Sequence, residues 1–219
     1  MHVNHLHDWD VTPKEAVAIQ QDFAGRLRDE PLDMDTITHV AGVDVSVKNG
    51  ISQAAVVILT YPDLAVVEIQ RAAMPTPFPY VPGLLTFREG PTLEMAFAQI
   101  NTVPDVLIFD GMGRIHPRHM GIAAHFGLWL DLPTIGCGKT HFIGDYDEPD
   151  AQKGAFTPLL YKGEQLGVVL RTRTNVKPVY ISPGHRCDID SAMALTLRCT
   201  PKYRLPEPIR QAHNAAGDL

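Results

Sequence analysis

The sequence predicts an α/β fold in which a mixed central sheet is flanked by helices. Three consecutive strand-like segments joined by short turns come early in the chain and predict an antiparallel meander. After them, helical and strand-like segments alternate, which is typical of parallel strands with helices packed on both faces of the sheet. The 219 residues are enough for one domain with a substantial core, and we expect a single domain spanning residues 1–219.

The first predicted elements are a capped helix and the meander. Thr12, Pro13 and Glu15 form a helix start, because Thr12 and Glu15 can cap each other's backbone N–H groups and proline suits the first turn. We expect this helix to end near Arg28. Asn49-Gly50 is typical of a hairpin turn between two strands. The predicted strands of the meander are 38–47, 51–60 and 64–73.

A proline-rich loop precedes the alternating elements. Segment 74–83 contains four prolines, which exclude a helix or a central strand and favour a stiff, extended loop. Apolar spacing predicts a helix over 88–100, and a short continuous apolar run predicts a buried, parallel strand over 103–111. The same patterns predict a helix over 118–130 and a strand over 132–138.

The last third of the chain is expected to add two strands and two helices. Residues 140–160 are polar and are expected to be irregular. Strand patterns cover 163–172 and 177–184. A helix over 188–199 is expected to begin at the capping residue Asp188, and a short helix is expected over 207–216.

Composition limits the class of protein. Hydrophobic residues make up 45% and charged residues 20%, which is ordinary for a soluble globular domain. The chain lacks an apolar run long enough for a membrane span, and its first residues do not resemble a signal peptide, so we expect a cytoplasmic protein without a membrane partner. The three cysteines form no C-x-x-C pair and predict reduced thiols instead of a disulfide framework or a zinc site.

The charge distribution is uneven. A net charge of −6 argues against a general basic field that would hold DNA. Between residues 171 and 213, however, eight lysines and arginines face three acids. This segment predicts either a local basic face or an ordinary solvated surface, and charge alone does not distinguish them.

Two phosphate-binding motifs are suggested by the sequence but fail in detail. Gly111-x-Gly113 follows an apolar run as in a dinucleotide-binding turn, yet the position of the third glycine is His116, followed by a proline. An NAD-dependent oxidoreductase is therefore disfavoured. GCGKT at 136–140 resembles the end of a P-loop, but the required first glycine is Pro133. Lys139 still follows a buried strand, where it could reach a phosphate.

Three acids occupy positions that favour a metal site. Asp44 lies within an apolar strand, Asp110 ends another, and Glu89 begins a predicted helix beside the stiff loop. An ionised carboxylate in a buried strand is costly unless it is paired or bound to a metal. Oxygen ligands of this kind suit Mg²⁺ or Mn²⁺, which support phosphoryl transfer. Structural carboxylates satisfied by hydrogen bonds remain the alternative.

Acids on the first strand of a meander and at the end of a fourth strand resemble the ribonuclease H-like architecture. Five blocks in order make the resemblance specific and cover nearly the whole chain, and together they resemble the endonuclease V family of deaminated-base repair nucleases. The blocks are GVDVSV (42–47), PYVPGLLTFREGP (79–91), DGMGRIHPRHMGIA (110–123), GKT within GCGKTHF (136–142) and SPGHRCDIDSA (182–192).

The resemblance implies a DNA repair endonuclease. Such enzymes cut the second phosphodiester bond on the 3′ side of a deaminated base, chiefly hypoxanthine in deoxyinosine, and leave 3′-hydroxyl and 5′-phosphate ends. They use Mg²⁺, for which Mn²⁺ can substitute. By motif match, Asp44, Glu89 and Asp110 are the expected metal ligands and Lys139 contacts the scissile phosphate. His213 is a further expected catalytic residue, with a surface histidine as the alternative.

The resemblance also implies how the base is recognised. Tyr80, between prolines in PYVP, is expected to enter the duplex as a wedge, with a surface aromatic packed on its own prolines as the alternative. The flipped base is expected to enter a tight pocket. The residues expected to form it are Gly83, Leu85, Gly111, Gly113, Gly121 and Ile122. Those expected to touch the DNA backbone or support the site are Arg88, His116 and Arg118.

Some predictions stay open at this level. The expected partner is double- or single-stranded DNA containing deoxyinosine, and an inosine-specific endoribonuclease or a catalytically silent nucleic-acid binding module are the alternatives. We expect a monomer. Met112, Arg114 and the turn at 136–138 depart from the family pattern and leave the base preference less defined than the metal chemistry.

Overall fold

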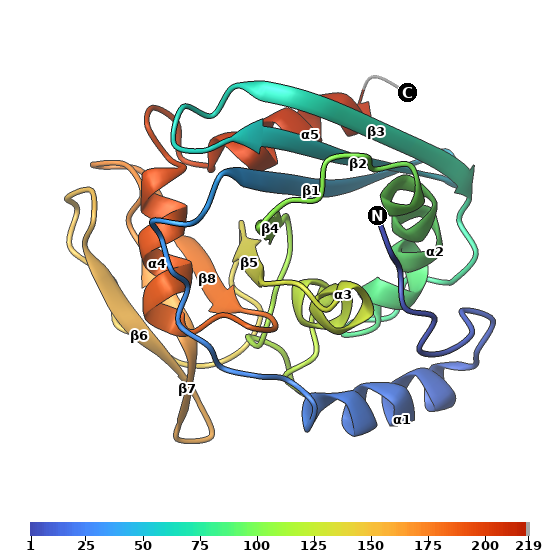
Figure 1. The fold of residues 1–219 in the computed structure, drawn as a ribbon. Coiled ribbons are helices and arrows are strands. Elements are labelled where there is room, and N and C mark those ends of the chain that lie inside the picture. Colours follow the sequence, from blue (N-terminus) through green and yellow to red (C-terminus); the bar gives the residue numbers. More distant parts are fainter. Residues whose placement is uncertain (218–219) are drawn as a thin grey trace.

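An eight-stranded mixed sheet runs through the computed structural model, which describes residues 1–217 (Figure 1). The strand order is β3-β2-β1-β4-β5-β8-β7-β6. The strands are β1 (His39–Lys48), β2 (Ile51–Thr60), β3 (Val66–Pro75), β4 (Val106–Phe109), β5 (Thr134–Gly138), β6 (Phe156–Tyr161), β7 (Glu164–Leu170) and β8 (Val179–Pro183). The helices are α1 (Pro13–Ala24), α2 (Leu85–Ala98), α3 (Ile122–Leu130), α4 (Ile189–Arg198) and α5 (Glu207–Gly217).

The antiparallel meander is confirmed. β1 pairs with β2 and β2 pairs with β3, both antiparallel. At the first hairpin, Asn49 and Gly50 have φ values of 53° and 77°, and a tight turn with two positive φ values matches the twist of the strands that it joins. β2 has the bounds that the sequence pattern predicted.

Parallel pairing is limited to the middle of the sheet. β4 lies parallel to both β1 and β5, as the apolar run predicted. Beyond β5, the strands β8, β7 and β6 each pair antiparallel with their neighbour, so the expectation of parallel strands after the meander holds for β4 and β5 alone. Since β4 and β5 are parallel, their carboxyl ends lie side by side at the same end of the central strands.

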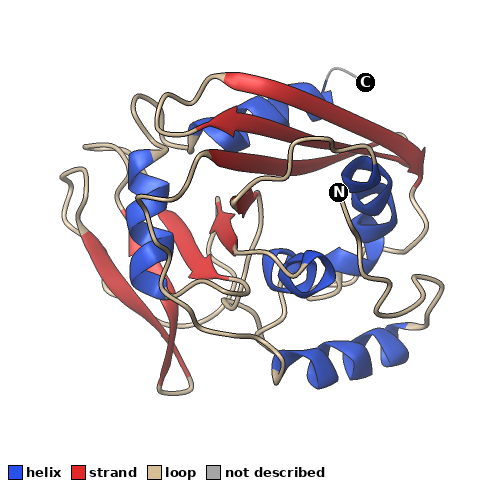
Figure 2. Cartoon of the chain, viewed as in Figure 1, coloured by secondary structure: helices blue, strands red, loops and turns tan. Residues whose placement is uncertain are grey.

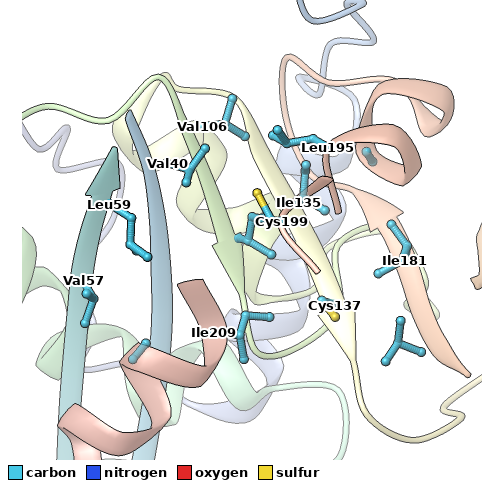
Figure 3. Packing of buried hydrophobic residues seen from close by; sticks show 14 of the residues in the cluster. Val40, Val57, Leu59, Val106, Ile135, Cys137, Ile181, Leu195, Cys199 and Ile209 are labelled. Carbon is cyan, nitrogen blue, oxygen red and sulfur yellow. The ribbon is translucent and has the colours of Figure 1, made fainter. Parts of the chain in front are cut away.

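Helices cover both faces of this sheet, as predicted (Figure 2). Alternate side chains of β1 divide between two cores, with Val40 in the core beneath α4 and α5 and Ala41 in the core beneath α2 and α3. Figure 3 shows the first core, where Ile209 of α5 and Leu195 of α4 pack towards the strands. None of the described helices combines the length and apolar character that a membrane span requires.

Several predicted boundaries were wrong because tertiary contacts override local pattern. α1 ends at Ala24 instead of near Arg28, whose backbone N–H and carbonyl bind His185 and Arg186 in the loop after β8. α3 begins at Ile122 instead of 118, because the preceding loop folds back and Gly121 N–H donates to Gly113 O at 2.9 Å.

Two more elements differ from their predicted extent. α2 begins at Leu85, before the predicted residue 88, and contains Pro91 within it. β6 lies within the segment 140–160 that was predicted to be irregular. It lies at the edge of the sheet, where β7 is its partner strand among residues 1–217 and Leu160 also forms an isolated bridge with Asp145. Pro158 is tolerated here because an edge strand leaves some backbone N–H groups unpaired.

Gly42 brings α5 unusually close to the sheet. A Cβ atom at this position would lie 1.9 Å from the carbonyl oxygen of Pro208 in the first turn of α5. The backbone of α5 therefore lies directly against β1, and only glycine leaves room for this approach.

We predict that Gly42→Ala lowers the free energy of unfolding by about 1–3 kcal/mol, because the added methyl group overpacks the contact between β1 and α5. Denaturant unfolding measures this change. The matched control is Gly25→Ala, where an added Cβ meets nothing within 4 Å and φ is −72°. Equal stabilities of the two variants would contradict the close packing.

Candidate active site

The register of β1 and β4 places two carboxylates side by side. Val43 pairs with Phe109 in the parallel ladder, so the next residues, Asp44 and Asp110, are neighbours. The Asp110 N–H donates to Val43 O at 2.9 Å and fixes this alignment. Asp44 lies on the same side of β1 as Gly42, which faces α5. Both carboxylates are nearly buried, with side-chain exposures of 8% and 12%.

His213 of α5 completes a group of possible metal ligands. Its Nδ1 lies 3.2 Å from Oδ2 of Asp44. One ligand atom from each of Asp44, Asp110 and His213 lies within 4.8 Å of the others. Two carboxylates and an imidazole that converge at the end of a buried strand fit a divalent cation, and predominantly oxygen ligands suit Mg²⁺ or Mn²⁺. The expected role of His213 therefore has a geometric basis.

Glu89 approaches the same place from α2 on the other face of the sheet. It lies outside the group of ligand atoms within 4.8 Å of one another, but its side chain is buried. Burial, followed by repulsion from Asp44 and Asp110, raises the pKa of Glu89 to about 8, against an opposing effect of Arg88. Three acids thus share one poorly solvated space, and a bound cation would favour their charged forms.

Lys139 adds a positive charge to this acidic group. It directly follows β5, and its Nζ forms an ion pair with the carboxylate of Asp110. Burial and the hydrogen bond with Asp44 raise the pKa of Asp110 to about 7, against the opposing effect of Lys139. The ammonium group therefore lies beside the acids at the carboxyl ends of β4 and β5.

A cavity of about 440 Å³ opens beside Asp110 and Lys139. This volume lies within the usual range of small-ligand sites. Of the residues expected to form a base pocket, five line the cavity: Gly83, Leu85, Gly111, Gly121 and Ile122. A Cβ at Gly111 would lie 2.7 Å from Ile122, and one at Gly121 would lie 2.3 Å from the Met112 carbonyl oxygen. These glycines therefore allow the segments that form the cavity wall to pack closely against one another.

Gly113, the sixth expected pocket residue, is not part of the cavity wall. Its N–H donates to Ser182 Oγ at 2.9 Å, and an added Cβ would lie 2.3 Å from Pro183 O. Gly113 thus packs against β8, and the expectation that it lines the pocket is corrected.

Tyr80 lies at the mouth of the cavity with 72% of its surface exposed. The loop that carries it ends at Gly83, whose φ of +79° is the left-handed conformation that favours glycine. Three donors bind the carbonyl oxygen of Gly83. They are Gln20 Nε2 at 3.0 Å, His116 Nε2 at 2.9 Å and Arg118 Nη2 at 2.9 Å.

The three residues expected to touch DNA backbone or support the site all bind this loop. Arg88 Nη1 donates to Phe78 O at 2.8 Å, while His116 and Arg118 bind the other end of the loop. Burial lowers the pKa of His116 to about 4, so the ring is neutral near pH 7. Its Nδ1 accepts from Arg118 N–H at 3.2 Å, which leaves the proton on Nε2 for Gly83. In this structure all three residues therefore hold the loop that carries Tyr80.

Several lining residues were not identified from the sequence. Thr140, His141 and Phe142 follow Lys139 directly and line the cavity. Their signal was their position next to the lysine motif. Gln20 was missed as well, and its signal was a polar residue on the buried face of α1.

Two of the departures from the family pattern, Met112 and Arg114, have different environments. Met112 lines the cavity and fills the space beside Gly138, where an added Cβ would lie 2.3 Å from Met112 Cε. Arg114 instead pairs with Asp29 at 2.7 Å and donates to Gly184 O at 3.3 Å. Met112 therefore contributes to the cavity, while Arg114 ties together surface loops.

Comparison with known proteins identifies relatives of this chain. The family model described as Endonuclease V matches residues 21–214. The endonuclease V of Methanothrix thermoacetophila is 48% identical over 213 residues, which cover 97% of this chain and 94% of that protein. That of Nostoc punctiforme is also 48% identical and covers 96% of each chain.

Solved structures show the same fold. The endonuclease V of Streptomyces avermitilis superposes with a TM-score of 0.91 at 42% identity, covering 96% of this chain and 93% of that one. A Ciona intestinalis endonuclease V, in complex with a DNA that contains an inosine followed by a ribo-adenosine, has a TM-score of 0.82 at 26% identity. The alignment covers 95% of this chain and 98% of the Ciona chain.

We predict that Glu89→Gln stabilises the metal-free protein at alkaline pH. The pKa of Glu89 is raised from 4.5 to about 8, so the folded state binds more protons than the unfolded state between these values. Stability is therefore lost as pH rises through this window, and glutamine removes the loss. With EDTA present at pH 8, the variant should gain about 1–3 kcal/mol, or several degrees in Tm, while at pH 5 the proteins should be alike.

The matched control is Glu164→Gln, which removes an exposed carboxylate that is not part of this group. Thermal unfolding at both pH values measures the effect. An equal loss of stability between pH 5 and pH 8 in wild type and Glu89→Gln would show that Glu89 is not buried among the other acids.

Proposed function

The chain belongs to the endonuclease V family, and we propose that it is a DNA repair endonuclease that acts on deaminated bases, chiefly hypoxanthine in deoxyinosine. In this proposal it hydrolyses the second phosphodiester bond on the 3′ side of the lesion and leaves 3′-hydroxyl and 5′-phosphate ends. The observation that carries the proposal is the position of the Asp44, Asp110 and His213 ligand atoms directly beside a cavity of about 440 Å³.

The proposed metal ligands are Asp44, Asp110 and His213, with Glu89 contributing a further carboxylate. When bound there, Mg²⁺ or Mn²⁺ supplies a more acidic water and stabilises charge on the departing oxygen. The three acids favour cation binding because their mutual repulsion is relieved by a positive charge. His213 holds Asp44 in place through its Nδ1.

Lys139 is proposed to bind the scissile phosphate. Its ammonium group lies between the acidic group and the cavity, since it pairs with Asp110 and also lines the cavity wall. When a phosphate enters here, Lys139 would exchange its partner Asp110 for a phosphate oxygen, and the freed carboxylate would be available to hold a cation. The lysine thereby aligns the bond that is cut with the ligand group.

The cavity is proposed to hold the flipped base. Backbone N–H and C=O groups of its glycine-rich wall are proposed to pair with the 6-oxo and N1–H edge of hypoxanthine and to mismatch the amino group of adenine. Leu85 and Ile122 supply apolar contact with the ring faces. Tyr80 at the mouth is proposed to take the place that the base leaves in the stack.

Inosine-containing RNA is a second candidate substrate. The DNA bound to the Ciona relative has a ribonucleotide directly after the inosine, so a strand with a 2′-hydroxyl at that position is bound by a protein of this fold. Parallel assays on single-inosine DNA and RNA distinguish the two substrates. A catalytically silent binding module is disfavoured because the three acids and Lys139 are all present.

The proposed function predicts Mg²⁺-dependent cleavage of an end-labelled duplex with a single deoxyinosine. The mapped cut should lie at the second bond 3′ of the lesion, and the matching undamaged duplex should stay intact. Asp44→Ala should lower the cleavage rate by at least about 10³-fold, because a metal ligand is lost, while circular dichroism should show an unchanged fold. Full cleavage by this variant in Mg²⁺ would refute the ligand assignment.

Tyr80→Ala should weaken binding to inosine-containing DNA by about tenfold, because an exposed aromatic that stacks on a base contributes on the order of 1–3 kcal/mol. A gel-shift titration measures the effect. Tyr80→Phe is the control and should bind nearly as wild type, since it keeps the ring. Unchanged binding by Tyr80→Ala would exclude the wedge role.

A further inference from the structure

A surface next to α5 carries an aromatic ring and cations that the proposed catalysis leaves unused. It consists of Lys202, Tyr203 and Arg210, and is called here the Tyr203 shelf. We propose that the Tyr203 shelf binds the part of the nucleic-acid strand that lies 3′ of the cut bond. This inference rests on the proposed function for the direction of the strand.

The contacts within the shelf suit a stacking surface. Arg210 lies over the ring of Tyr203, with its Cζ at 3.9 Å from the ring centroid, and Lys202 Nζ lies at 5.4 Å. Tyr203 is 39% exposed although it is a large aromatic residue. Aromatic rings and guanidinium planes are the groups on which unpaired bases stack. The shelf therefore offers the chemistry of a single-strand contact.

The two cations of the shelf differ in whether their charge is compensated. Arg210 pairs with Glu207 at 3.0 Å, so its charge is compensated and its planar group acts mainly in stacking. Among residues 1–217, no ion pair with a carboxylate is found for Lys202, so its ammonium group is free for a phosphate. With a net charge of −6, the protein needs such local cations to hold a polyanion.

The shelf connects to the catalytic residues on two sides. Arg210 precedes His213 by three residues in α5, so both lie on the same face of that helix. Arg204, the neighbour of Tyr203, donates to Lys139 O at 2.6 Å and to Pro178 O at 2.7 Å. The shelf is thereby held in a fixed position relative to the ligand group.

The order of these groups gives the direction of the strand. Asp110 and Lys139 line the base cavity, whereas Asp44 and His213 lie on the side towards α5 and are not among the lining residues. A strand with its lesion base in the cavity and the second 3′ bond at the carboxylates therefore continues towards Arg210. The nucleotides that reach the shelf are those beyond the cut.

The test compares single-stranded inosine substrates with two lengths of 3′ flank. One extends about eight nucleotides beyond the cut, within the site size of single-strand binding surfaces. The other is trimmed to the first nucleotide beyond the cut. Trimming should raise the KM of the wild type about tenfold, and Tyr203→Ala should raise the KM for the long substrate by a similar factor, with kcat within about twofold.

The decisive comparison combines the trimmed substrate with the Tyr203→Ala variant. With the trimmed substrate, Tyr203→Ala and wild type should have the same KM within about twofold, because the variant has lost only the contact that trimming removes. For the long strand, the logarithm of the binding constant falls linearly with the logarithm of the salt concentration. Lys202→Gln should reduce the steepness of this line by about one. An unchanged KM for the long substrate, or an equal increase for both substrates, would overturn the proposal.

The protein offers a matched control pair. In the β6–β7 hairpin, Lys162 Nζ lies 5.1 Å from the centroid of the Tyr161 ring. This is the same kind of lysine–aromatic contact as in the shelf, at the β6 edge of the sheet. Tyr161→Ala and Lys162→Gln should leave the KM for the long substrate unchanged once folding is verified by thermal unfolding. An effect as large as that of the shelf variants would show that the loss is not specific to the shelf.

Binding without cleavage separates this proposal from the proposed function. Anisotropy with a labelled, undamaged single strand in EDTA measures the shelf contact independently of the lesion. Tyr203→Ala should weaken this binding about fivefold or more. If the wild type fails to cut inosine substrates but the variant loses affinity, the proposed function is wrong, and the shelf is a single-strand contact whose position relative to a cut is no longer assigned. Equal affinities in this assay would overturn the shelf.

Discussion

Two carboxylates that lie side by side on adjacent parallel strands impose the central constraint on this molecule. Asp44 and Asp110 are brought together by the register of β1 and β4, and their backbones cannot separate without breaking that ladder. Their repulsion in a poorly solvated space is outweighed by the apolar side chains that hold the strands on both faces. The remaining elements deliver partners to this pair: Lys139 from β5, His213 from α5 and Glu89 from α2.

Local sequence signals predicted the parts of the fold that local chemistry determines. The meander followed from alternating β-branched residues and the Asn49-Gly50 turn, and the acids stood out because they interrupt apolar strands. Long-range contacts determine the rest. The loop before α3 is set by a hydrogen bond between Gly121 and Gly113, and β6 exists because β7 pairs with it in spite of Pro158.

The loop residues show why a motif can identify residues without identifying their contacts. His116 and Arg118 were recognised as important, but a sequence does not reveal that both bind one carbonyl oxygen of Gly83. Gln20 escaped notice because its partner lies 63 residues away. Since His116 and Arg118 belong to the same segment as Asp110, the mouth of the cavity and the acidic group are held by one piece of chain.

The close packing of α5 on Gly42 has a consequence for the order of folding. α5 follows every other described element along the chain, yet it covers β1 and supplies His213 to a residue 169 positions earlier. During synthesis the apolar side chains on this face of β1 and β2 therefore stay uncovered until α5 has left the ribosome. The ligand group is assembled in the same late step, so an incomplete chain would be both aggregation-prone and unable to cut nucleic acid.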